Sequence, residues 1–128
     1  MLFEVILTIL GYLLGGIPVG LIIGKIFKGI DVREHGSGNM GAANVARLVS
    51  KKAGVFTMVG DMLKGGIATF LGRILIWSGE FKGYTNKPFF SDPGVFLALI
   101  GLAAIIGHSY PVYIGFNGGK SGSVSAGL

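Results

Sequence analysis

The chain has 128 residues, of which 51% are hydrophobic, 13% are charged and 24 are glycine, and its mean hydropathy is +0.70. This composition is too apolar for a soluble domain or a disordered chain, and the glycines lack the three-residue period of collagen. The absence of cysteine excludes a disulfide scaffold. The net charge of +5 is carried mostly by one loop, which is typical of membrane topology and not of nucleic-acid binding.

The first apolar segment runs without a charge from Val5 to Gly24. Twenty residues at ~1.5 Å each cover ~30 Å, so one membrane-spanning helix is expected. A signal peptide is disfavoured, because Glu4 is the only early charge and no A-x-A-like cleavage site follows. Pro18 is expected to bend the helix and to free a carbonyl that a neighbouring helix must satisfy. The G-x-x-x-G spacings of this segment favour packing inside one bundle over a dimer face.

The stretch 35–47, "HGSGNMGAANVAR", follows this helix. Its glycines can expose consecutive backbone N–H groups that cup an anion, and Ser37 and Asn39 add polar side chains. Residues 42–52 are expected to form one helix, with Asn44, Arg47 and Lys51 on one face and a phosphate at its N-terminus. An ordinary flexible loop with a Ser or Asn cap is an equally good interpretation at this point.

A second helix is expected from Ala53 to Trp77, although Asp61, Lys64 and Arg73 interrupt it. Asp61 and Lys64 would lie ~12–16 Å deep in the membrane, where charges are costly and usually pair. Their i, i+3 spacing predicts a pair within the helix. This structural role is favoured over a catalytic one.

The third apolar segment, Pro93 to Gly107, is short for a span and leads into the polar stretch 108–120. Gly118-Gly119-Lys120 resembles a P-loop only superficially, because residue 114, where that pattern needs glycine, is Ile114. Lys120 is better interpreted as a point charge for a phosphate. His108 is either an acid–base group or, preferably, a structural hydrogen-bonding residue. The tail 121–128 is expected to begin a fourth helix.

Six of the eleven basic residues lie between Lys25 and Lys52, whereas the loop 79–92 has only Lys82 and Lys87. The positive-inside rule therefore predicts a cytoplasmic first loop, an outside N-terminus and an external second connection. Alternation returns residues 108–120 to the cytoplasm. Both glycine-rich polar loops are thus expected on one side of the membrane.

Three ordered motifs, "GSGNMGAANVAR" (36–47), "DMLKGG" (61–66) and "GHSYPVYIGFNGGK" (107–120), carry a family resemblance. The chain resembles the bacterial acyl-phosphate-dependent glycerol-3-phosphate acyltransferases, which are integral membrane enzymes of phospholipid synthesis. The resemblance implies an all-α, multi-pass bundle in the bacterial inner (cytoplasmic) membrane. Residues 1–128 would form a single membrane domain, with three spans and the start of a fourth, as the N-terminal part of a longer bundle.

The resemblance also implies the reaction, in which a fatty acyl group moves from acyl phosphate to the 1-hydroxyl of glycerol 3-phosphate. The partners would be these two substrates, membrane lipids and the enzyme that supplies acyl phosphate, with no cofactor, metal or nucleic acid. Carried over by position, Ser37, Arg47 and Lys120 would be catalytic. The substrate-binding residues would be Gly36, Gly38, Asn39, Gly41, Asn44, His108, Gly118 and Gly119. The lack of cysteine and of a recognisable Ser-His-acid arrangement agrees with direct transfer.

The chain departs from the family pattern after Lys120, where Ser121-Gly122-Ser123 replaces glycine and a small-residue helix. A third family motif, with a histidine and an asparagine near the C-terminus, is missing, so the chain is interpreted as C-terminally truncated or as a degenerate homologue. Three alternatives remain open: a small transporter of phosphorylated metabolites, a structural membrane subunit and an inactive fragment of the enzyme. A transporter would usually show internal repeats, and none is found.

Overall fold

The computed structural model describes residues 2–79 and 92–115, and within these residues it contains helices and no strand. In chain order the elements are α1 (Leu2–Gly15), α2 (Val19–Lys28), η1 (Val32–Glu34), α3 (Ala42–Leu48), α4 (Lys51–Trp77), α5 (Pro93–Ser109) and η3 (Val112–Ile114). The predicted all-α class is therefore confirmed. The predictions for the tail 121–128 and for most of the loop 79–92 lie outside the described residues.

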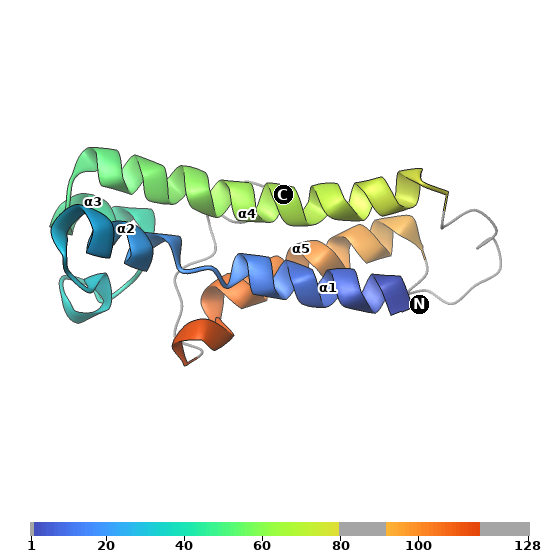
Figure 1. Cartoon of the computed structure of the whole chain (residues 1–128), viewed down its shortest axis with the longest axis horizontal. Helices are drawn as coiled ribbons and strands as arrows, with labels where there is room; N and C mark the ends of the chain where they lie inside the picture. Colours follow the sequence, from blue (N-terminus) through green and yellow to red (C-terminus); the bar gives the residue numbers. More distant parts are fainter. Residues whose placement is uncertain (1, 80–91, 116–128) are drawn as a thin grey trace.

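The helices form an elongated bundle around α4 (Figure 1). α4 has 27 residues, about 40 Å of helix at 1.5 Å per residue, and it contacts α1, α2, α3 and α5. α1 and α5 lie side by side and run in the same direction, antiparallel to α4 (Figure 1). The stretches Glu4–Lys28 and Pro93–Ile114 are long and apolar enough to cross a membrane. α4 carries more charged residues along its length than these two stretches, as the sequence indicated.

The first apolar segment is not one helix, which corrects the expectation of a continuous span over residues 5–24. α1 ends at Gly15 and α2 begins at Val19, with Pro18 at its N-cap (Figure 1). Proline has no N–H and its ring clashes with the preceding turn, so the helix ladder stops here. The predicted bend is thus a full interruption over residues 16–18.

Small residues let α1 approach α5 closely. A Cβ at Gly15 would overlap the backbone of Ala104, and one at Gly107 would overlap the carbonyl of Tyr12. Because backbone atoms cannot move aside cheaply, both positions require glycine. The prediction that these glycines pack inside one bundle is confirmed for the described residues.

The single helix expected over residues 42–52 is also wrong, because α3 ends at Leu48 and α4 starts at Lys51. The Ser50 hydroxyl accepts a hydrogen bond from the Ala53 N–H at 3.1 Å and caps α4. Serine at this position favours a new helix start over continuation. Lys51 therefore does not share a helix face with Asn44 and Arg47.

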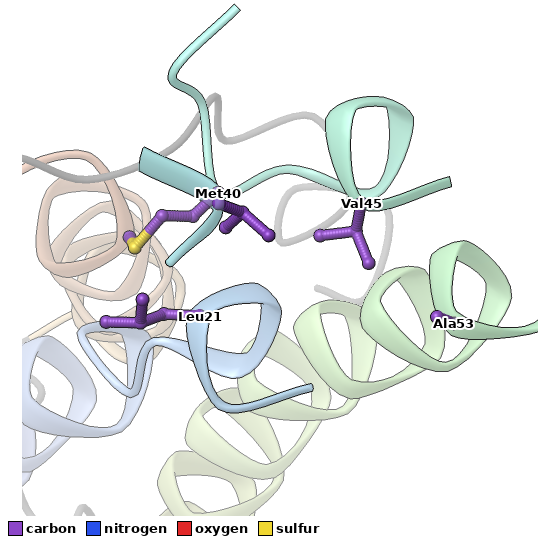
Figure 2. Packing of buried hydrophobic residues seen from close by; sticks show 5 residues of the cluster. Leu21, Met40, Val45 and Ala53 are labelled. Atoms are coloured by element: carbon purple, nitrogen blue, oxygen red, sulfur yellow. The ribbon is translucent and has the colours of Figure 1, made fainter. Parts of the chain in front are cut away.

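Two clusters of buried hydrophobic residues hold the bundle together. One lies among α1, α4 and α5 and comprises Ala68, Phe96, Ile100 and Ala104. The other, at the loop end, joins Leu21 of α2, Met40 of the loop, Val45 of α3 and Ala53 of α4 with Val32 (Figure 2). Ile114, which belongs to the second polar loop (residues 108–120), packs against this loop-end cluster. The two polar loops therefore lie close together as far as Gly115, and their common side of the membrane remains a prediction.

Candidate active site

The first loop is folded around the side chain of Asn44, which is 2% exposed. Its Nδ2 donates to the carbonyls of Val32, His35 and Asn39 at 3.0, 3.2 and 2.9 Å. Its Oδ1 accepts from the Ser37 N–H at 3.2 Å. Because the amide nitrogen has two hydrogens, the three carbonyls share them, and with the Oδ1 contact one side chain binds four backbone groups and fixes the loop conformation. The proposed substrate contact of Asn44 remains a prediction, and in this structure its amide binds the loop itself.

Two glycines allow the loop to close around Asn44. Gly36 and Gly38 have φ values of +56° and +72°, in the left-handed region that side chains disfavour. A Cβ at Gly36 would also overlap the Asn44 Oδ1. The glycines predicted from the sequence to line a phosphate site therefore have a conformational task in the loop.

The polar side chains on the loop differ in how firmly hydrogen bonds within the loop hold them. The Asn39 Oδ1 accepts from the Gly41 N–H at 2.8 Å, just before α3 begins. Ser37 is exposed, and its hydroxyl has one long contact, 3.4 Å from the Asn39 N–H. Ser37 is thus held at its backbone while its hydroxyl faces solvent.

The cations at this end fall into two groups. Arg33 makes a bidentate pair with Asp31, with contacts of 2.9 Å from Nε and 2.6 Å from a terminal nitrogen. The hydrogen bond from Arg33 lowers the pKa of Asp31 to about 2, and the Asp31 carboxylate raises the pKa of Arg33. Lys28 donates to the Leu48 carbonyl at the end of α3, at 2.6 Å. Arg47 is exposed and has no ion pair or hydrogen bond within residues 2–79 and 92–115, so its guanidinium is available to an anion.

The second loop is tied to α1 by two tyrosines that the sequence did not single out. The Tyr12 hydroxyl donates to the Tyr110 carbonyl at 2.6 Å, and the Tyr113 hydroxyl donates to the Leu13 carbonyl at 3.1 Å. These bonds fix the start of the loop beside the end of α1. Gly118, Gly119 and Lys120 lie outside the described residues.

A buried polar cluster lies beneath the two loops. The Lys64 Nζ donates to the carbonyls of Gly15 at 2.9 Å and Ile17 at 2.8 Å, and it lies 3.1 Å from the His108 Nδ1. Asp61 Oδ1 is 2.9 Å from the same nitrogen, so the predicted i, i+3 pair is confirmed.

The Asp61 carboxylate contacts Lys64 as an ion pair. Among the described residues the Asp61 Oδ1 accepts no hydrogen bond, although the ion pair is close. The ammonium has three hydrogens, and the two carbonyls and the imidazole are three acceptors. An ammonium only donates, so its contact with the His108 Nδ1 uses that nitrogen as an acceptor. The same nitrogen lies 3.8 Å from the Asp61 Oδ1. The structure thus gives His108 the predicted structural hydrogen bond, and its role toward a substrate remains a prediction.

The family model described as "Glycerol-3-phosphate acyltransferase" matches residues 5–128. The chain belongs to this family. A curated glycerol-3-phosphate acyltransferase of Streptococcus pneumoniae (strain Hungary19A-6) is 44% identical over 127 residues, which are 99% of this chain and 53% of that protein. The chain therefore spans about half the length of the curated relatives it matches.

Two crystal structures are also similar. Both are of PlsY (YgiH), described as an integral membrane glycerol 3-phosphate acyltransferase. The glycerol 3-phosphate form has a TM-score of 0.76 at 40% identity and covers 97% of this chain and 55% of the other. The lysophosphatidic acid form has a TM-score of 0.74 at 39% identity, with 97% and 54% covered. The resemblance deduced from the three motifs is confirmed.

Of the site residues predicted from the sequence, Ser37, Asn39, Asn44 and Arg47 are brought into one loop and short helix. His108 lies below them, at the end of α5, within the cluster of Lys64. The sequence missed the bond between Lys64 and α1. One signal did exist, because the carbonyl expected to be freed by Pro18 needed a donor from another helix.

Proposed function

We propose that the protein transfers a fatty acyl group from acyl phosphate to the 1-hydroxyl of glycerol 3-phosphate. The hydroxyl oxygen attacks the acyl carbon, the bond from that carbon to the phosphate oxygen breaks, and inorganic phosphate leaves. The hydroxyl proton passes to a substrate phosphate. The products are 1-acylglycerol 3-phosphate and phosphate.

The family match over residues 5–128 carries this proposal. The relatives of known structure are described as glycerol 3-phosphate and lysophosphatidic acid forms, which name one substrate and the product of such a reaction. Acyl phosphate as the donor is what the family resemblance implies, and we include it in the proposal because the chemistry of the site agrees with it. It is a reactive mixed anhydride, so an enzyme needs mainly to position it and to neutralise the charge of the leaving phosphate.

The first loop has side chains suited to positioning the acyl phosphate and neutralising its leaving phosphate. Ser37 presents an exposed hydroxyl on a backbone fixed by Asn44, and Arg47 presents an unpaired guanidinium among the described residues. We assign these two side chains, together with Lys120, to the substrate phosphates. We also assign substrate binding to the remaining predicted residues, which are Gly36, Gly38, Asn39, Gly41, Asn44 and His108 and, outside the described residues, Gly118 and Gly119.

The activity is tested by phosphate release from an acyl phosphate in mild detergent, with and without glycerol 3-phosphate, using the complete natural chain that contains these residues. Release that depends on glycerol 3-phosphate, with acylglycerol phosphate detected by mass, is the expected result. Ser37→Ala, Arg47→Lys and Lys120→Ala are each expected to lower the rate by ~10²–10³, because one preorganised charge-stabilising donor is lost. Lys52→Ala is the control, since Lys52 is an exposed cation at the same end of the bundle. Normal turnover by Arg47→Lys would contradict the role of the guanidinium fork.

We further propose that the loop end faces the cytoplasm of a bacterium, at its inner membrane, with the N-terminus outside. The excess of Lys and Arg between residues 25 and 52 supports this orientation. Ser50→Cys and Thr85→Cys are expected to react with an impermeant thiol reagent from opposite sides of the membrane. Labelling of Ser50→Cys from outside intact cells would overturn the orientation.

A further inference from the structure

Lys64 contacts three parts of the chain that are far apart in sequence. It belongs to α4, it donates to the two carbonyls of the break between α1 and α2, and it donates to His108 at the end of α5. Lys64 is 5% exposed and Asp61 is 2% exposed. The chemistry proposed above uses neither of them.

Charge neutralisation alone does not explain this arrangement. Asp61, one turn away on the same helix, is close enough to balance the ammonium without any other partner. The hydrogens of Lys64 nevertheless go to backbone carbonyls 47 and 49 residues away and to an imidazole 44 residues away. The end of α1 before Pro18 leaves the Gly15 carbonyl without a helical donor, and hydrocarbon offers no water in its place. The Ile17 carbonyl also accepts from the Val19 N–H at 2.9 Å.

Each partner of Lys64 is connected to one of the two loops, either by packing or by a short stretch of chain. The break at residues 16–18 sets the start of α2, whose Gly20 lies against the Met40 carbonyl and whose Gly24 lies against Val32. Met40 and Val32 flank the first loop. His108 is three residues before Pro111, the N-cap of η3 in the second loop.

We propose that Lys64 is a positioning residue that sets the separation of the two loops, through the carbonyls of Gly15 and Ile17 on one side and His108 on the other. Within the reaction proposed above, on which this role rests, it holds Ser37 and Arg47 of the first loop in a fixed position relative to residues 110–115 of the second loop. Asp61 supplies the counter-charge that allows an ammonium to occupy this place. Lys64 itself touches no substrate.

The first test measures loop separation without any assay of activity. The 128 residues contain no cysteine, and Glu34 and Val112 are exposed positions on the two loops. Spin labels at Glu34→Cys and Val112→Cys are compared by electron paramagnetic resonance in the parent chain and in Asp61→Asn/Lys64→Met, which removes both charges together. A narrow distance distribution in the parent and a broadened or shifted one in the double variant are expected. The same distribution in both would overturn the proposal.

The second test separates positioning from folding by kinetics. In Asp61→Asn/Lys64→Met the KM for glycerol 3-phosphate is expected to rise at least tenfold in the folded, monodisperse fraction. Arg73→Met removes an exposed cation from the same helix and is expected to leave KM unchanged. If the folded fraction of the double variant keeps the KM of the parent and only the yield of folded protein falls, the role of Lys64 is merely structural and the proposal is overturned. If the complete natural chain with Asp61 and Lys64 unchanged transfers no acyl group, the proposed function fails. The spin-label distances then still decide whether Lys64 sets the separation of the two loops.

Discussion

Two buried polar side chains organise this molecule, and they do so differently. Asn44 is neutral, and its amide binds backbone groups only 5 to 12 residues away. Lys64 is charged, and it binds backbone groups 47 and 49 residues away. Both donate to carbonyls that no regular secondary structure satisfies.

The difference follows from where each side chain lies. The loop of Asn44 is at the polar end of the bundle, where a neutral amide can satisfy nearby groups at little desolvation cost. The break at Pro18 is inside a segment long and apolar enough to cross a membrane, where unsatisfied carbonyls are costly. An ammonium there provides three strong donors, but it requires Asp61 nearby. A local group therefore shapes the loop, and a long-range ion pair places that loop within the bundle.

The largest expected effect comes from removing the charge at Lys64 alone. Lys64→Met leaves the Asp61 carboxylate buried without a counter-charge, and breaking a buried pair from one side costs about 3–5 kcal/mol. Unfolding in graded denaturing detergent measures this loss. Asp61→Asn/Lys64→Met is expected to regain a large part of it, because no uncompensated charge remains. Equal stability of Lys64→Met and the parent would show that the ion pair contributes nothing to the bundle.

Asn44→Ala is expected to have a smaller and more local effect. The carbonyls of Val32 and Asn39 and the Ser37 N–H lose their partner, whereas the His35 carbonyl keeps the Gly38 N–H. The cost is about 1–3 kcal/mol for groups that stay buried and less where water enters. Hydrogen exchange followed by mass spectrometry is expected to show faster exchange over residues 32–41 and unchanged exchange in the middle of α4. Faster exchange throughout α4 would mean that the loop and the bundle are not separate units.

A pair of glycine substitutions tests the space around Asn44. Gly29 and Gly36 have similar positive φ values of 66° and 56°, but a Cβ meets nothing within 4 Å at Gly29 and overlaps the Asn44 Oδ1 at Gly36. Gly29→Ala is expected to cost about 1 kcal/mol from left-handed strain alone. Gly36→Ala should cost about 1 kcal/mol more, because it also displaces the Asn44 acceptor. Equal losses of stability would show that the loop tolerates a shift of Asn44.

The smallest effect is expected from Asp31, whose pair with Arg33 lies at the surface. Asp31→Asn should cost less than about 1 kcal/mol, as exposed pairs do. The folded pKa of about 2 is below the ordinary value of 3.8, so the contribution is complete above pH ~4 and is lost as the pH falls toward 2. The Arg33 Nε–H resonance, followed by NMR during acidification, should report this midpoint. A midpoint near the ordinary value would mean that the pair does not form in solution.

The sequence predicted the helical class, the family and the Asp61–Lys64 pair, because hydrophobic segments, ordered motifs and i, i+3 spacing are local signals. It did not predict the end of α3 at Leu48, since Ser50 as a cap and Ser50 inside a helix look alike without packing. The four bonds of Asn44 were also hidden, because a loop amide can face a ligand or its own backbone. The direction of Lys64 toward α1 depends on helix packing across nearly fifty residues, which no short pattern encodes.

The break at Pro18 also has a consequence for synthesis of the protein. α1 and α2 leave the ribosome before Lys64, and a chain grows by roughly 5–20 residues per second, so the Gly15 carbonyl lacks its Lys64 donor for about 2–10 s. The bonds from Tyr12 and Tyr113 form later still, across 98 and 100 residues. The first helix therefore enters the membrane as an incomplete part. Without Lys64 the Gly15 carbonyl never gains this donor. In cells the first consequence of losing Lys64 should therefore be removal of the new chain by quality-control proteases.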